Sequence, residues 1–175
     1  MNALAKRAVA ERELLLTRVF DAPVDLVWQA WTQKPHLEKW LAPHTVTIVH
    51  AQVDLRPGGR WRLRVRFPGG AEFWVGGVYR EIVPNRLLVM TDTWDEESAT
   101  PGPETIVTVR FKELGGKTQV TLHQAPFDSV ETRDGHSRGW NACLDILAKR
   151  LAKQPASSVS TSNGEEWWTR STGTR

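Results

Sequence analysis

The sequence predicts an α+β fold in which one antiparallel sheet curls around a long C-terminal helix. Residues 60–67 alternate arginine with apolar side chains, and several later runs repeat this two-residue period between short turns rich in glycine and proline. Residues 128–153 instead place apolar side chains three or four positions apart, the period of a helix. With 175 residues, of which 40% are hydrophobic, the chain favours a single domain with one core.

The N-terminal part predicts one strand followed by two short helices. Residues 14–20 have strand character, and Asp21 and Pro23 suit the cap and first turn of a helix over residues 24–31. Residues 35–41 restart as a second short helix. This order places a helical layer directly after the first strand.

The strand over residues 60–67 has one buried and one solvated face. Trp61, Leu63 and Val65 alternate with arginines, so all the arginines share the outer face. An arginine ladder could bind nucleic acid, but we expect no aromatic residue to interleave on the same face. We interpret the ladder as a solvated sheet face.

Turn lengths predict which other residues share the buried face. A three-residue loop at 57–59 directs four side chains of the preceding strand inward: Leu55, Val53, Ala51 and Val49. A three-residue loop at 68–70 does the same for Phe73, Val75, Gly77 and Tyr79, whereas a four-residue loop would select Trp74 and Val78. We prefer the shorter loop.

The next turns extend this face across the sheet. A two-residue turn at Pro84 and Asn85 pairs Tyr79 with Met90 and Gly77 with Asp92. The inner face then gains Leu88, Met90, Asp92 and Trp94, followed by Val107, Val109, Phe111, Val120 and Leu122. These strands bring the predicted total to seven.

The C-terminal helix is predicted from a capping box formed by Asp128 and Glu131 to about residue 153. One face of this helix collects His136, Trp140, Cys143, Leu147 and Leu151. That face must pack on the sheet. Residues 1–13 are then a lead-in, residues 14–153 the domain, and residues 154–175 a flexible Ser/Thr-rich tail containing the Trp167–Trp168 pair.

Charge and composition exclude several classes of function. The net charge is +3 with the signs interspersed, which does not indicate a nucleic-acid binder. Cys143 is the single cysteine, and the N-terminal apolar run is too short for a signal peptide or membrane span, so we expect a cytoplasmic protein. The five histidines lack metal-ligand spacing and no phosphate-binding glycine loop occurs, so neither a metal nor a cofactor is expected.

The ordered motifs resemble one known family. They are Phe20-Asp21-Ala22-Pro23, Val27-Trp28, Ala30-Trp31-Thr32, Lys39-Trp40, Pro57-Gly58-Gly59, Glu81-Ile82-Val83-Pro84 with Arg86-Leu87, and Gly139-Trp140. Over about residues 14–151 the chain resembles the AHSA1-like family of Hsp90-ATPase-activator homologues, in the START/Bet v 1-like (SRPBCC) superfamily. The resemblance implies a helix-grip fold, a seven-stranded sheet around the last helix, with a cavity that accepts apolar molecules in relatives.

The resemblance leaves the function open, because the superfamily includes carriers, cyclases, stress-associated proteins and partners of transcriptional regulators. Chaperone activators of this family carry a separate N-terminal domain, which the 13 residues before Leu14 cannot supply. We therefore do not expect Hsp90 activation.

The candidate ligand-binding residues are the large and polar side chains predicted to face the space between sheet and helix. The walls would be Trp61, Met90, Trp94 and Trp140, and the orienting groups Tyr79, Asp92 and His136. Each has a structural alternative: Asp92 can accept a hydrogen bond from a tyrosine or indole, and His136 can be a satisfied core histidine. Glu81 follows the same inward parity unless the strand bulges.

Residues 135–139 formally match the G-x-S-x-G nucleophile pattern, but no strand precedes Ser137 and no histidine follows it. We interpret Gly135 and Gly139 as permitting close helix packing or a kink. The first functional hypothesis is a monomeric or homodimeric protein that binds an apolar or amphipathic small molecule. The second is a stress-linked co-chaperone or regulator-interacting protein. The third is a cyclase- or dehydratase-like enzyme using His136 and Asp92, and a non-enzymatic role is preferred.

Overall fold

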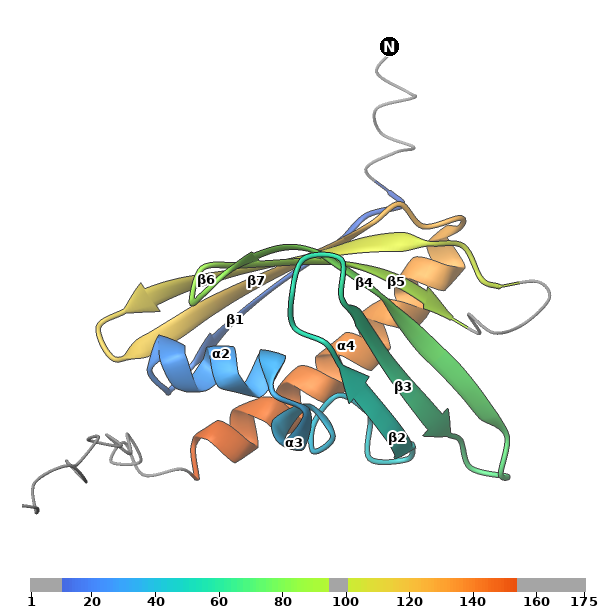
Figure 1. Cartoon of the computed structure of the whole chain (residues 1–175), viewed down its shortest axis with the longest axis horizontal. Helices are drawn as coiled ribbons and strands as arrows, with labels where there is room; N and C mark the ends of the chain where they lie inside the picture. Colours follow the sequence, from blue (N-terminus) through green and yellow to red (C-terminus); the bar gives the residue numbers. More distant parts are fainter. Residues whose placement is uncertain (1–10, 95–100, 154–175) are drawn as a thin grey trace, which may run out of the picture.

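The fold of the chain is a single sheet with helices on one side (Figure 1). The structure, a computed structural model, describes residues 11–94 and 101–153. The strands are β1 (Leu14–Phe20), β2 (Thr47–Val53), β3 (Arg60–Arg66), β4 (Glu72–Val83), β5 (Leu87–Trp94), β6 (Thr105–Leu114) and β7 (Lys117–Ala125). The helices are α2 (Val24–Thr32), α3 (Lys34–Leu37) and α4 (Val130–Leu151).

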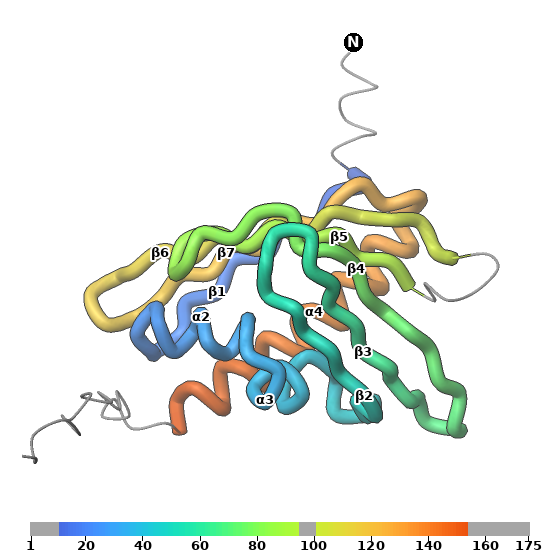
Figure 2. The backbone as a smooth tube through the Cα atoms, in the orientation of Figure 1, coloured from blue at the N-terminus to red at the C-terminus, as the bar shows by residue number. Residues whose placement is uncertain are grey.

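The seven antiparallel strands that the sequence predicted form one sheet in the order β1-β7-β6-β5-β4-β3-β2. Helices α2, α3 and α4 lie on the same side of this curved sheet (Figure 2). The fully buried side chains of the inner face come mainly from β5, β6 and β7, and Leu144 and Leu147 of α4 belong to the same buried cluster. The inner face of the sheet is therefore the core of the domain.

The register between β3 and β4 confirms the three-residue loop. Val65 pairs with Phe73, Leu63 with Val75 and Trp61 with Gly77. Trp74 consequently points to the outer face, where the Arg62 guanidinium lies 4.2 Å from the centre of its ring. An aromatic side chain thus does lie on the arginine face, contributed by the neighbouring strand.

The predicted inward parity of β2 is correct only at one end. Ala51 faces the core as predicted, but it pairs with Leu63, and Val53 pairs with Trp61, two residues away from the predicted partners. A bulge between Ile48 and His50 then reverses the parity, so Ile48 packs against the core while Val49 is exposed. Leu55, predicted inward, lies outside the strand and is 38% exposed.

A second bulge, in β4, determines which way the Glu81 side chain points. Tyr79 pairs with Met90 as predicted, but the next pair joins Glu81 to Val89, which leaves Arg80 as the extra residue in β4. Glu81 is exposed as a result. Glu81 is therefore not among the side chains that face the helix.

The register places Gly77 opposite Asp92, as predicted, and side-chain hydrogen bonds supplement the backbone ladder at this point. Thr91 accepts through Oγ1 from the Val78 N–H at 3.0 Å, and its carbonyl accepts from the Trp61 indole at 2.9 Å. A Cβ on Gly77 would lie 2.0 Å from the Thr91 carbonyl oxygen, so this position requires glycine. The Trp61 indole thereby bridges a gap in the ladder between β4 and β5.

Two predicted caps are corrected. Ser129, and not Asp128, caps α4, because its hydroxyl accepts from the Thr132 N–H at 3.1 Å. Asp21 does not cap α2 but lies 3.5 Å from the Lys117 ammonium. The second short helix, α3, is shorter than predicted, and turns continue from it to Trp40.

Candidate functional site

One pocket lies between the inner face of the sheet and α4. Its volume is about 260 Å³. The loop after α3, strand β3 with the residue that follows it, the end of β5 and the first half of α4 provide its lining: Leu41, Ala42, Pro43, Val46, Val65, Phe67, Trp94, Gly135, His136, Gly139, Trp140 and Cys143. This lining is apolar and aromatic except at His136, which is the usual character of a small-molecule site.

Three of the seven candidate residues line this pocket: Trp94, His136 and Trp140. The other four are buried beside it without belonging to its lining: Trp61, Tyr79, Met90 and Asp92. The five strand residues among the seven face inward as predicted, and His136 and Trp140 lie on α4 where the helical period placed them. Parity alone, however, does not separate side chains that border the pocket from those packed in the core.

Trp140 is held in one orientation by two contacts. Its indole N–H donates to Gln124 Oε1 at 2.7 Å. Its ring stacks on Trp31 of α2, with the ring centres 5.9 Å apart and the planes 21° from parallel. Because core residues make both contacts, the Trp140 ring that forms the pocket wall is held in position before a ligand binds.

The hydrogen bond from Trp140 continues into the core as a polar chain. The Gln124 amide nitrogen donates to Thr105 Oγ1 at 2.8 Å and to Asp92 Oδ1 at 3.4 Å. An indole only donates, so it fixes the orientation of the Gln124 amide. Burial raises the pKa of Asp92 to about 7. The Asp92 carboxyl thus lies two hydrogen bonds away from Trp140 in the pocket wall.

Gln124 is a residue that sequence reasoning missed. It is fully buried and shares the inward parity of Val120 and Leu122 on β7. A polar side chain at an inward position of a central strand was the available signal, because such a group must find partners in the core.

His136 provides the polar group of the pocket lining. One ring nitrogen, Nδ1, lies 3.0 Å from the Thr132 carbonyl oxygen and therefore donates to it. In the neutral imidazole this leaves Nε2 as an acceptor. The ring packs between Phe127, at 4.9 Å between centres, and Trp94, at 6.5 Å. His136 can accept one hydrogen bond from a ligand held in an otherwise apolar space.

The two glycines of α4 create room rather than close packing. A Cβ added to Gly139 would meet nothing within 4 Å, and one added to Gly135 would meet only the end of the Arg138 side chain at 4.0 Å. The expectation that these glycines permit close helix packing is therefore wrong. Both line the pocket, so their missing side chains enlarge it.

Tyr79 and Cys143 remain protonated at neutral pH. Burial, and to a lesser extent the Asp54 carboxylate, raises the pKa of Tyr79. Burial raises the pKa of the Cys143 thiol to about 12. Cys143 thus contributes a small apolar wall to the pocket and not a thiolate nucleophile.

No cluster of three or more potential metal ligands occurs in the described ranges 11–94 and 101–153. In the same ranges, no helix has both the length and the apolar character needed to cross a membrane.

A seven-stranded antiparallel sheet wrapped around its C-terminal helix, with an apolar pocket between them, defines a helix-grip protein. The comparisons give the family. The family model described as "Activator of Hsp90 ATPase homolog 1-like protein" matches residues 21–152. The chain belongs to this AHSA1 family, in the START/Bet v 1-like superfamily, as the sequence motifs predicted. No curated protein matches the chain.

Solved structures support the same fold. Protein CV1439 from Chromobacterium violaceum is 24% identical, with a TM-score of 0.72, and the match covers 81% of this chain and 99% of that one. Protein NE0264 from Nitrosomonas europaea is 27% identical, with a TM-score of 0.69 and coverage of 82% and 96%. The AHSA1 protein SPO3351 from Silicibacter pomeroyi is 22% identical, with a TM-score of 0.72 and coverage of 80% and 97%.

Proposed function

We propose that the protein binds a small apolar or amphipathic molecule in the pocket between the sheet and α4. The observation that supports this proposal most directly is the lining, in which apolar and aromatic side chains surround a single imidazole. At about 260 Å³ the pocket is slightly below the range of roughly 300–1,000 Å³ for small-molecule sites, so the ligand is compact.

The proposed ligand has an aromatic or alicyclic body and one hydrogen-bond donor. The body would lie against Trp94 and Trp140, and the donor would meet Nε2 of His136. Trp61, Tyr79, Met90 and Asp92 would act indirectly, by supporting the sheet on which the pocket rests.

Proton transfer between His136 and Asp92 is not part of this proposal. Asp92 is 7% exposed and does not line the pocket that His136 lines. Its carboxyl oxygen accepts instead from Gln124. A general acid or base must reach the reacting group, and Asp92 has no such access.

Two probes test the predicted chemistry: naphthalene and 2-naphthol, which differ only by a hydroxyl donor. Calorimetric titration should give tighter binding for 2-naphthol, because its hydroxyl can donate to His136. The variant His136→Phe keeps an aromatic ring but removes the acceptor, so the two probes should then bind equally. If the preference for 2-naphthol survives this change, His136 does not orient the ligand.

A second variant tests the location of the site. Gly139→Leu places an isobutyl group in the pocket and should abolish binding of both probes. The matched control is Arg138→Leu, an exposed position on the same helix, which should bind them normally. Native mass spectrometry of gently purified protein would identify the natural ligand. Unchanged probe binding by Gly139→Leu would exclude this pocket.

A second candidate function is binding to a protein partner, since the family supports either a ligand-binding or a co-chaperone-like fold. The supporting observation is the outer-face cluster of Arg62 and Arg64 around the partly exposed Trp74 ring. Arginine and tryptophan are enriched at binding hot spots. The double variant Arg62→Glu with Arg64→Glu should lose partners in a pull-down from the native organism, and an unchanged pull-down would remove this candidate.

A further inference from the structure

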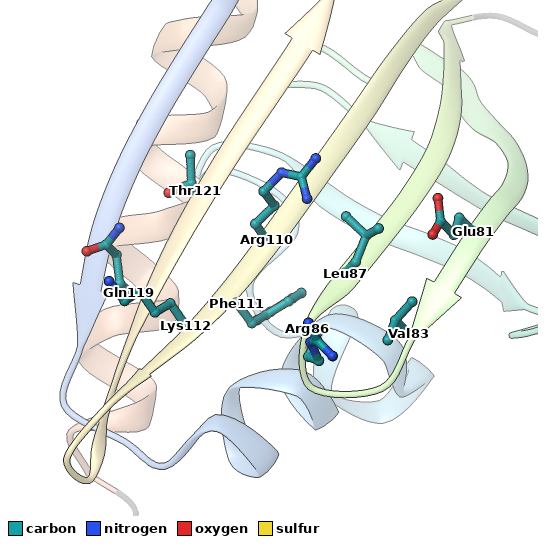
Figure 3. Close-up of a pocket in the computed structure, with 9 residues that line it drawn as sticks. All are labelled: Glu81, Val83, Arg86, Leu87, Arg110, Phe111, Lys112, Gln119 and Thr121. Atoms are coloured by element: carbon teal, nitrogen blue, oxygen red, sulfur yellow. The ribbon is translucent and has the colours of Figure 1, made fainter.

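A second hollow lies on the opposite face of the sheet from the pocket described above. Its volume is about 540 Å³. Figure 3 shows the residues that line it, at the ends of β4 to β7. Its polar lining comes from Glu81, Arg86, Arg110, Lys112, Gln119 and Thr121. Nothing in the proposed binding of an apolar molecule uses these side chains.

The strand register concentrates positive charge in this hollow. The Phe111 N–H donates to the Arg86 carbonyl at 2.9 Å, so Arg86 lies across from Phe111. The neighbours of Phe111 in the sequence, Arg110 and Lys112, both alternate to the outer face because Phe111 itself is buried. Arg110 and Lys112 therefore share the outer face. Arg86, which lies opposite Phe111 in the turn before β5, does not share their parity but lines the same hollow (Figure 3).

These cations differ from the arginines at the other end of the sheet. There Arg64 and Arg66 each lie 2.7 Å from a carboxylate oxygen of Glu72. Arg86, Arg110 and Lys112 are exposed and have no ion-pair partner in the described part of the chain. Their charges are thus available to an external anion.

The geometry points to a site for a small phosphate-bearing molecule with more than one anionic group. Arginine binds phosphate through two parallel N–H donors, and lysine adds a point charge. Gln119 pairs with Lys112 and Thr121 pairs with Arg110 on the adjacent strand, so an amide and a hydroxyl lie beside these cations. Arg110 and Lys112 are roughly 7 Å apart along β6, which suits two linked phosphates better than one.

Two features favour a small molecule over a macromolecular surface. The cations line a hollow, whereas docking of a protein partner requires a broad complementary patch. The lining also includes one acid, Glu81, which opposes anions at one end of the hollow and so limits the length of anion that fits.

Inorganic pyrophosphate is the probe for this site. Calorimetric titration at fixed ionic strength should give a dissociation constant on the order of 1 mM or tighter. Arg110→Gln and Lys112→Gln should each weaken binding about tenfold, as expected for loss of a charge-assisted hydrogen bond. Glu81→Gln should strengthen binding. The matched control is Arg64→Gln, which removes the same charge from the same sheet face at a distant site.

The relative sizes of these changes in affinity decide whether the proposal holds. Equal weakening by Arg64→Gln and Arg110→Gln would mean only non-specific attraction to a cationic face and would overturn it. Undetectable binding of pyrophosphate by the unmodified protein would also overturn it. Methylenediphosphonate and citrate, added in separate titrations, distinguish phosphate recognition from recognition of any polyanion: tight citrate binding with no diphosphonate binding would contradict a phosphate site. None of these outcomes depends on the apolar pocket.

Discussion

The two halves of the space beneath the sheet differ although the same helix covers both. The C-terminal half of α4 contributes Leu144 and Leu147, which are fully buried in the hydrophobic core. Beside the ends of β3 and β5 the first half of α4 contributes Gly135 and Gly139, and a pocket of about 260 Å³ remains. We name these the packed half and the open half.

The difference shows that the choice of side chain on one helix face separates core from pocket. A leucine removes apolar surface from water and stabilises the fold, whereas a glycine in a helix lowers stability by about 1 kcal/mol relative to alanine. No neighbouring atom within 4 Å requires glycine at position 139, although glycine destabilises the helix there. This is the pattern expected where a helix position is kept small to leave room for a ligand.

The largest effect is expected at the buried carboxyl of Asp92. Asp92→Asn should leave stability unchanged near pH 4 and raise the free energy of unfolding by on the order of 4 kcal/mol at pH 8. The raised pKa of about 7 means that the unfolded chain ionises Asp92 from about pH 4 while the native state retains the proton. Native stability therefore falls as pH rises through this window, and the variant lacks this fall.

Urea unfolding of the two proteins at pH 4, 6 and 8 measures this difference. Asp145→Asn is the control, because the side chain of Asp145 is 65% exposed and its variant should follow the unmodified protein at every pH. A constant difference between Asp92→Asn and the unmodified protein across the three values would contradict the raised pKa.

The packed half should be sensitive to truncation. Leu147→Ala removes a side chain that is 1% exposed and should lower the free energy of unfolding by about 3 kcal/mol. Probe binding to the folded protein should change little, since Leu147 does not line the pocket. Chemical denaturation and titration with 2-naphthol together check this separation, and a loss of affinity as large as the loss of stability would show that the halves are coupled.

The two tryptophans of the open half should respond differently. Trp140→Phe leaves Gln124 Oε1 without its donor inside the core and should lower stability by about 2 kcal/mol. Trp94→Phe breaks no hydrogen bond to the described residues and should have less than half this effect. Thermal denaturation of the two variants side by side gives the comparison, and equal losses would show that the bond to Gln124 contributes nothing.

The last effect is a small gain in stability. Gly139→Ala should stabilise the protein by about 1 kcal/mol, because the added methyl meets no neighbour and alanine favours the helix. The same methyl should weaken 2-naphthol binding by reducing the pocket. A stabilised variant with unchanged affinity would show that Gly139 is not retained for ligand space.

Much of the inner face could be predicted because side-chain direction in a strand has a period of two. The loop of residues 68–70 predicted the parity of Tyr79, and Tyr79, Met90 and Asp92 do face the core. The predicted two-residue turn at Pro84 is wrong, because Val83 pairs with Leu87, and the extra residue at Arg80 restores the predicted pair of Tyr79 with Met90. The helix stripe containing His136 and Trp140 followed from the helical period in the same way. Both periods are local properties of the backbone.

The bulges could not be predicted from those periods. One extra residue at Arg80 turned Glu81 to solvent, and one at Val49 turned Ile48 to the core. Each shifts the parity of every residue beyond it, and nothing in the local pattern marks where a strand must bend around a helix.

The sequence by itself determined the family, the number of strands and their succession along the chain, and the set of side chains that could face a ligand. Ordered motifs, short-range periodicity and turn chemistry suffice for these features. Only the tertiary structure decided that Trp94, His136 and Trp140 border a pocket while Trp61 and Asp92 are packed in the core. It also showed that Gln124 connects the two groups. The physical reason is that a cavity depends on how far strands and helix lie apart, which bulges and distant packing partners set together.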